Sequence, residues 1–188
     1  MATYNTSDIR KGLKLEMDGA PWKIVYFQFV KPGKGTAFTR TKLKNLITGN
    51  VIERTFRTGS KLEAADVESF KMQYLYNDGE DFHFMNTETY EQLGISAKAL
   101  GDATHWLIEE DFADVLFYKG QPVSAEVSDF VYMVLSCDPG VKGNTAQGGT
   151  KPATLATGHT INVPLHIEDG TKVKIDTRTG EYVERVKE

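Results

Sequence analysis

Hydrophobic and polar residues alternate along most of the chain, a pattern typical of half-buried β-strands. In the first third the alternating segments cover residues 12–17, 22–31, 36–45 and 51–57. Asp18-Gly19 and Thr48-Gly49-Asn50 separate two pairs of these segments and are typical turn sequences. No part of this region has helical spacing, so its four or five short strands predict a small SH3-like barrel.

The middle third combines strands with a helical segment. Residues 70–76 and 80–85 read as strands joined by Asn77-Asp78-Gly79, a strong hairpin signal. Residues 87–93 and 95–108 contain short helical stretches, and strand character resumes over 114–118 and 122–127. This order predicts a five-stranded barrel of the oligonucleotide-binding (OB) type.

The last third again consists of short strands, over residues 130–137, 153–157, 160–164, 172–176 and 181–186. A loop rich in Gly, Asn and Thr covers 141–150. This third predicts another small all-β barrel. The predicted fold is therefore all-β, with three small barrels in a row over residues 1–64, 65–128 and 129–188.

Charge divides the chain along the same lines, although the 188 residues carry a net charge of only −4. Residues 1–64 hold 12 Lys and Arg against 5 Asp and Glu, a net of +7. Residues 65–128 hold 3 against 13, a net of −10, and residues 129–188 hold 7 against 8. This division predicts that the first third faces a polyanion. The acidic middle either avoids that polyanion or serves solubility.

The segment between the second and third predicted strands contains Lys31-Pro32-Gly33-Lys34-Gly35. Pro32 presets φ at the first turn position, and we expect Gly33 to supply the positive φ of a type II turn. The sequence thus predicts a hairpin tip that carries a single lysine, Lys34. An ordinary solvated turn lysine is the alternative.

On the strand after this tip, an aromatic residue and three cations lie at a spacing of two. They are Phe38, Arg40, Lys42 and Lys44. Residues at this spacing share one face of a strand. Cations beside an aromatic ring suit contact with nucleic-acid phosphates and bases. The alternative is a solvated sheet face without a partner.

The sequence lacks the residues that several classes of function require. Gly33-Lys34-Gly35-Thr36 is not a phosphate-binding P-loop, because a glycine follows the lysine. The four histidines lack metal-ligand spacing, and the single Cys137 excludes both a zinc site of cysteines and an internal disulfide. No serine lies in a nucleophile-elbow sequence. No apolar run is long enough for a membrane helix, and no signal peptide is recognisable. We expect no enzyme activity, metal or cofactor, and a cytoplasmic protein.

Three blocks of sequence, spread in order over the whole chain, resemble the bacterial elongation factor P family. They are Lys31-Pro32-Gly33-Lys34-Gly35, Tyr74-Leu75-Tyr76-Asn77-Asp78-Gly79, and Asn162-Val163-Pro164-Leu165-His166-Ile167-Glu168-Asp169-Gly170 with its continuation over 174–186. The resemblance implies an SH3-like domain and two OB-type domains in an L shape similar to tRNA. It also implies action on ribosomes that stall at consecutive prolines, with the protein bound between the peptidyl and exit sites to promote peptide-bond formation.

The resemblance gives the predicted tip a role. Lys34 corresponds to the lysine that many bacterial members carry modified, commonly by a lysyl-tRNA-synthetase-like enzyme. The tip residues Lys31 to Gly35 would then contact peptidyl-tRNA or ribosomal RNA, together with Arg40, Lys42 and Lys44.

Sites in the last third follow from the same resemblance. The family's loop near the exit-site codon of the mRNA usually reads Gly-Asp-Thr, and here it is Gly143-Asn144-Thr145, with one charge fewer. Tyr182 and Arg185 match positions expected to contact the small ribosomal subunit. We expect a monomer that contacts both subunits. The alternatives are a family paralogue with another client and a general RNA-binding or RNA-chaperone module.

Overall fold

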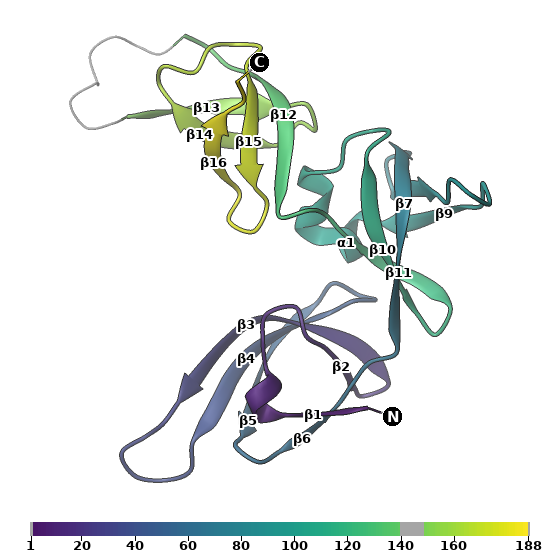
Figure 1. Cartoon of the computed structure of the whole chain (residues 1–188), viewed down its shortest axis with the longest axis vertical. Helices are drawn as coiled ribbons and strands as arrows, with labels where there is room; N and C mark the ends of the chain where they lie inside the picture. The colour runs from purple at the N-terminus through teal and green to yellow at the C-terminus, as the bar shows by residue number, and fades with distance from the viewer. Residues whose placement is uncertain (1, 140–148, 188) are drawn as a thin grey trace.

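Three β-rich domains follow one another in a bent row (Figure 1). The computed structural model describes residues 2–139 and 149–187. The first domain contains β1 to β6, the second β7 to β11 and the third β12 to β16. The predicted mostly-β architecture of three domains is confirmed.

The first domain combines a four-stranded sheet, ordered β2-β3-β4-β5, with a two-stranded β1–β6 sheet. Its apolar core includes Ile9, Leu15, Ile24 and Leu43. The elements are β1 (Thr3–Asn5), the 3-10 helix η1 (Thr6–Asp8), β2 (Lys14–Met17), β3 (Ala20–Val30), β4 (Phe38–Asn45), β5 (Val51–Arg57) and β6 (Lys61–Glu63).

The second domain is a five-stranded sheet in the order β11-β10-β7-β8-β9, with a short helix packed against it. Phe84 and Val115 are fully buried in its core. The elements are β7 (Val67–Asn77), β8 (Asp81–Met85), β9 (Gln92–Ser96), the helix α1 (Ala97–Leu100), the 3-10 helix η2 (Gly101–His105), β10 (Phe112–Tyr118) and β11 (Gln121–Glu126).

The helical prediction for the second domain is partly wrong. Residues 97–105 are helical, with the Ser96 hydroxyl accepting from the Ala99 amide at 3.2 Å as the N-cap. The segment 87–93 is instead a tight turn that leads into β9. Asn86 Oδ1 accepts from the amides of Glu88 and Thr89 there, and this local turn competes successfully with a helix.

The third domain is a five-stranded sheet in the order β14-β13-β12-β15-β16, curved so that β14 and β16 approach each other. Val163, Val173 and Ile175 are fully buried in its core. The elements are β12 (Phe130–Ser136), β13 (Thr150–Leu155), β14 (Thr160–Pro164), β15 (Lys172–Asp176) and β16 (Glu181–Arg185).

Each domain shares apolar contacts with the next. Leu46 of the first domain is buried with Leu116, Tyr118 and Val123 of the second. We call the contacts between these domains the first junction. Trp106, which follows η2 in the second domain, is buried in the core of the third. We call that contact and its surroundings the second junction.

Candidate nucleic-acid interface

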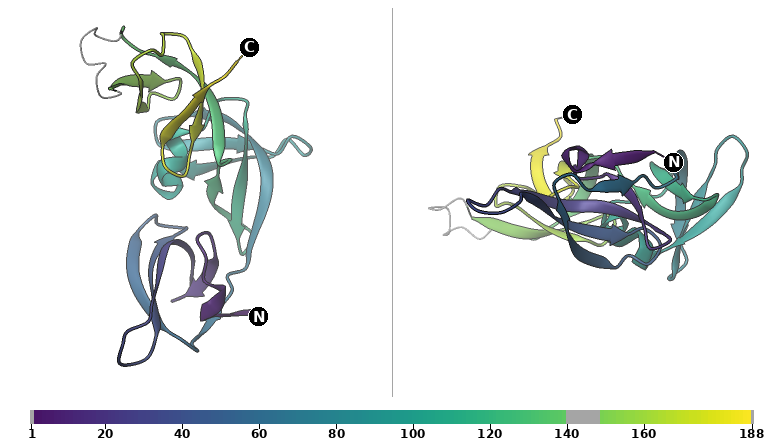
Figure 2. Two further views of the ribbon diagram at one scale, coloured as in Figure 1. Left: turned by 60° about the vertical axis from the view of Figure 1, so that its left-hand side comes forward. Right: turned by 90° about the horizontal axis from the view of Figure 1, so that it is seen from below.

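Lys34 lies on an exposed bend between β3 and β4. The loop of this hairpin is at the end of the molecule farthest from the third domain (Figures 1 and 2). Gly33 and Gly35 flank the lysine and are exposed as well. Among the described residues, no side chain forms a hydrogen bond or ion pair with Lys34.

The turn geometry differs from the prediction. Gly33 does not have a positive φ, whereas Gly35 has a φ of +103°. The expected type II turn at Pro32-Gly33 is therefore wrong. The chain reverses over a wider bend, and the conformation that favours glycine comes directly after Lys34 rather than before it.

In the hairpin arm that supports this bend, β3 has exposed aromatic side chains on both of its faces. A bulge at Val25 shifts the register between β3 and β4. Beyond this point Tyr26, Phe27 and Phe29 are all exposed, Phe29 to 60%. A strand that belonged to a barrel wall would bury one face. The sequence signal was the apolar run Val25-Tyr26-Phe27, where alternation breaks down, but the exposure of the aromatic side chains was not predicted.

The outer face of β4 carries the predicted cations. Thr39, Thr41 and Leu43 point inward and are buried, while Arg40 and Lys42 point outward and are exposed. The Arg40 guanidinium lies 5.6 Å from the Phe38 ring centre, and the Lys42 ammonium 5.6 Å from that of Tyr26. The spacing of two thus brings cations and aromatic rings together on one face.

An open groove near the tip continues this face. Its volume is about 540 Å³, and it is lined by Thr36, Phe38, Arg40, Thr55 and Arg57. Arg57 is opposite Phe38 in the register of β4 and β5, and Thr55 is opposite Arg40. The groove therefore presents two guanidinium groups and an aromatic ring within the reach of one polyanionic strand.

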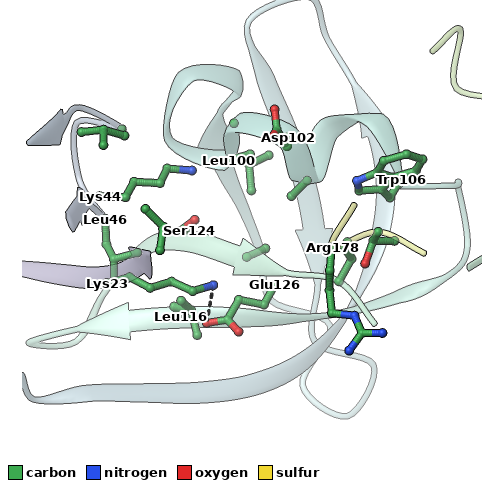
Figure 3. A pocket seen from close by; sticks show the side chains of 18 of the residues that line it. Lys23, Lys44, Leu46, Leu100, Asp102, Trp106, Leu116, Ser124, Glu126 and Arg178 are labelled. Carbon is green, nitrogen blue, oxygen red and sulfur yellow. Dashed lines mark ion pairs between the residues drawn. The ribbon is translucent and has the colours of Figure 1, made fainter. Parts of the chain in front are cut away.

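Lys44 lies on the same face of β4 as Arg40 and Lys42 but in a different environment. It is half-buried and lines a cavity of about 570 Å³ to which all three domains contribute, including Asp102 of the second and Arg178 of the third (Figure 3). Burial lowers the pKa of Lys44, nearby Lys23 acts in the same direction, and Asp102 opposes them. The structure therefore separates Lys44 from Arg40 and Lys42.

The candidate residues of the third domain are not brought together with the hairpin. Gly143, Asn144 and Thr145 lie outside the described residues. Tyr182 and Arg185 are both on β16, where Tyr182 is half-buried against the domain core and Arg185 is exposed. Only Arg185 therefore offers its side chain freely to a partner.

In the described ranges, no group of three or more His, Cys, Asp or Glu side chains is arranged to hold a metal ion. No helix in those ranges is long and apolar enough to cross a membrane.

Comparison with known protein families gives three matches in the order of the domains. Residues 5–62 match the Elongation factor P (EF-P) KOW-like domain. Residues 67–125 match the Elongation factor P (EF-P) OB domain, and residues 131–185 match Elongation factor P, C-terminal. Together the three matches cover almost all of the chain.

Solved structures with similarity to this chain include two initiation factors. Eukaryotic translation initiation factor 5A from Methanococcus jannaschii is 25% identical, with 64% of this chain and 90% of that chain covered and a TM-score of 0.49. A translation initiation factor eif-5a family protein from Naegleria fowleri is 16% identical, with 67% and 98% covered and a TM-score of 0.43.

Proposed function

Since this chain belongs to the elongation factor P family of non-catalytic translation factors, we propose that it relieves ribosomes that stall at consecutive prolines. It would act in the cytoplasm, bind the ribosome between the peptidyl and exit sites, and promote peptide-bond formation at consecutive prolines. The peptidyl-transferase chemistry remains that of the ribosome. The observation that carries this proposal is the exposed Lys34 at the end of a projecting hairpin.

Lys34 would reach the peptidyl-tRNA and stabilise its reactive position. Proline is a slow nucleophile, so a factor that orients the reactants addresses the part of the barrier that arises from positioning. Pro32 fixes its own φ and would reduce the entropy lost when the tip binds, while Lys31, Gly33 and Gly35 would lie against the same partner. The exposed ε-amine is also accessible to a lysyl-tRNA-synthetase-like enzyme, which would extend it covalently.

Arg40 and Lys42 would hold the hairpin against RNA phosphates. Both are exposed on the outer face, and their only described anionic neighbour is Glu53, 4.0 Å from Lys42. An exposed pair at that distance contributes little, so Lys42 remains available for phosphate. Lys44 would contribute from the cavity between the domains, at the edge of this surface.

The third domain would contact the small subunit. We propose this role for Tyr182 and Arg185, and contact with the exit-site codon of the mRNA for Gly143, Asn144 and Thr145. The protein would act as a monomer, and we propose folding units over residues 1–64, 65–128 and 129–188.

Reconstituted translation of a message with three consecutive proline codons tests the proposal. Lys34→Ala should abolish the relief of stalling, because the group that reaches the peptidyl-tRNA is lost. Lys172 is the control, since it is also an exposed lysine without a described side-chain hydrogen bond or ion pair, at the start of β15 in the third domain. Lys172→Ala should retain activity. Full activity of Lys34→Ala would refute the proposal.

Lys34→Arg separates charge from covalent extension. Arginine keeps the charge and most of the length but has no ε-amine to acylate. If the extension is essential, this variant should fail as Lys34→Ala does, and mass spectrometry of the native protein should find added mass on Lys34. The alternative, a general RNA-binding module, makes a different prediction for the wild-type protein. It would bind arbitrary single-stranded RNA without ribosomes and would not relieve stalling.

A further inference from the structure

The first junction is a built contact and not a flexible linker. The Leu46 side chain, directly after β4, is enclosed by Leu116, Tyr118 and Val123 of the second domain. All four side chains are buried. Burial of apolar side chains across a domain boundary opposes separation of the domains.

Polar pairs surround this apolar contact. The Tyr118 hydroxyl donates to Glu16 Oε1 of β2 at 2.5 Å. Glu126 Oε1, at the end of β11, lies 3.0 Å from Lys14 Nζ and 3.7 Å from Lys23 Nζ, and Figure 3 shows the second of these ion pairs. The pairs join two strands of the first domain to two strands of the second, so they oppose rotation as well as separation.

Two glycines allow the closest approach of the domains. Gly49, in the β4–β5 turn, faces α1, and a Cβ at this position would lie 2.5 Å from the carbonyl oxygen of Lys98. Gly101, directly after α1, would place a Cβ 2.6 Å from Lys44 Nζ. The end of a lysine side chain can move away at low cost, but a backbone carbonyl cannot. At Gly49, therefore, added bulk has to displace either the β4–β5 turn or the domain that carries α1.

β4 connects this contact to the hairpin tip. Leu46 and Gly49 follow one end of the strand, and the Lys34 bend precedes the other. A strand of eight residues is roughly 25 Å long, so a rotation of about 10° at the junction would displace the tip by roughly 4 Å. Displacements of about 1 Å can already lower a reaction rate a hundredfold when the reacting groups must be aligned.

We propose that the contact of Gly49 with α1 sets the angle between the first and second domains and thereby positions Lys34. Gly49 is a positioning residue in this scheme, since it acts through the hairpin and does not touch the peptidyl-tRNA. The functional part of the inference rests on the proposed role in relieving stalling, whereas the structural part does not.

Gly59 provides a matched control. It lies in the β5–β6 turn of the same domain with a φ of +94°, close to the +77° of Gly49. A Cβ at Gly59 would meet no atom within 4 Å. Alanine at either position therefore has similar backbone strain, and only Gly49→Ala adds the collision with α1.

The first experiment measures the angle between the domains. Spin labels are attached to T36C, beside the tip, and E88C, in the β8–β9 turn of the second domain, in a C137S background. Both positions are exposed. Gly49→Ala should shift the distance distribution by several ångströms or broaden it, and Gly59→Ala should leave it unchanged. Identical distributions for the two variants would overturn the proposal. If Gly49→Ala does not fold, Gly49→Asn adds the same Cβ in a residue that tolerates a positive φ better, and it should shift the distribution relative to Gly59→Asn. Identical distributions for these two variants would likewise overturn the proposal.

The second experiment measures stalling relief over a range of factor concentrations. Gly49→Ala should lower the maximal rate of Pro-Pro bond formation about tenfold or more, with the half-saturating concentration changed less than about twofold. A variant that is merely less stable would instead recover at high concentration, and that result would overturn the positioning role. An inactive parent protein purified from its native host would refute the proposed function, while the label distances would still test the junction.

Discussion

The two junctions bury an apolar side chain in different ways. At the second junction, Trp106 belongs to the main core of the third domain, with Met133, Leu155 and Ile161 among its companions. At the first junction, Leu46 contributes to a separate cluster of four buried residues, apart from the core of either domain. Polar pairs flank the first junction, whereas a stack of two imidazole rings lies beside the second.

This difference indicates how the domains move. A domain that has its neighbour's tryptophan in its core cannot separate without opening that core, so we expect the second and third domains to behave as one body. The first domain can rotate once a small cluster and a few polar pairs are disrupted. The hairpin with Lys34 therefore belongs to the part of the molecule whose position is most easily altered.

Trp106→Ala should have the largest effect. Truncation of a buried tryptophan costs about 3 to 5 kcal/mol of unfolding free energy. The third domain should then unfold at a lower denaturant concentration than the other two. The protein has two tryptophans, so in this variant all tryptophan fluorescence comes from Trp22 in the core of the first domain. The unfolding transitions measured by circular dichroism and by this fluorescence should therefore no longer coincide in denaturant titrations. Trp106→Phe, which keeps most of the volume, should cost much less; coincident transitions in Trp106→Ala would contradict a shared core.

Leu46→Ala should have an intermediate effect, about 2 to 3 kcal/mol, because the small cluster leaves a smaller cavity than a main core does. We expect the loss to appear as earlier unfolding of the first domain alone, measured by the fluorescence of Trp22 in a Trp106→Phe background. Ile47→Ala is the control, because Ile47 is next to Leu46 in the sequence but its side chain is exposed. This substitution should change the unfolding free energy by no more than about 0.5 kcal/mol. Equal losses from the two variants would mean that the first junction adds no stability.

The pH dependence of stability should also distinguish the two junctions, with a smaller effect than either truncation. The rings of His105 and His159 stack with centres 3.9 Å apart across the second junction, and Thr157 Oγ1 donates to the His105 carbonyl at 2.7 Å. Burial lowers the pKa of His159 below its ordinary 6.5, the neighbouring His105 acts in the same direction, and Asp102 opposes them. The folded protein therefore binds fewer protons than the unfolded protein just below pH 6.5.

It follows that the contribution of His159 is fully present above about pH 6.5 and decreases as the pH falls through that value toward the lower pKa of the folded state. Thermal unfolding at a series of pH values between 5 and 8 should show this loss, and His159→Gln should reduce it. His166→Gln, at an exposed histidine outside the stack, should not. An unchanged pH profile in His159→Gln would show that the stack is not the source.

Local sequence patterns predicted the local structure well. Alternation in β4 identified the outward-facing Arg40 and Lys42, because the side-chain period of a strand requires no knowledge of its partners. The segment over 31–35 predicted where the hairpin ends. The positive φ was assigned to the wrong glycine, since it depends on how the two arms twist into the bend.

Contacts between distant segments could not be predicted. Trp106 reads as a residue of the second domain, and only the path of η2 places it in the core of the third. Lys44 has the same spacing as Lys42, but the approach of α1 places it in a cavity. The pairing of Glu126 with Lys14 and Lys23 joins residues more than a hundred positions apart, and nothing in their local sequence indicates it.

Lys34→Ala should have the smallest effect on stability, because the tip belongs to neither junction. Its exposed side chain has no described hydrogen bond or ion pair. We expect an unfolding free energy within about ±0.5 kcal/mol of the wild type. Denaturant unfolding measures this value. The distance between spin labels at T36C and E88C should be the same with and without the Lys34→Ala substitution. A loss above 1 kcal/mol would mean that the tip contributes to the fold, and the stalling assay could then no longer separate reach from stability.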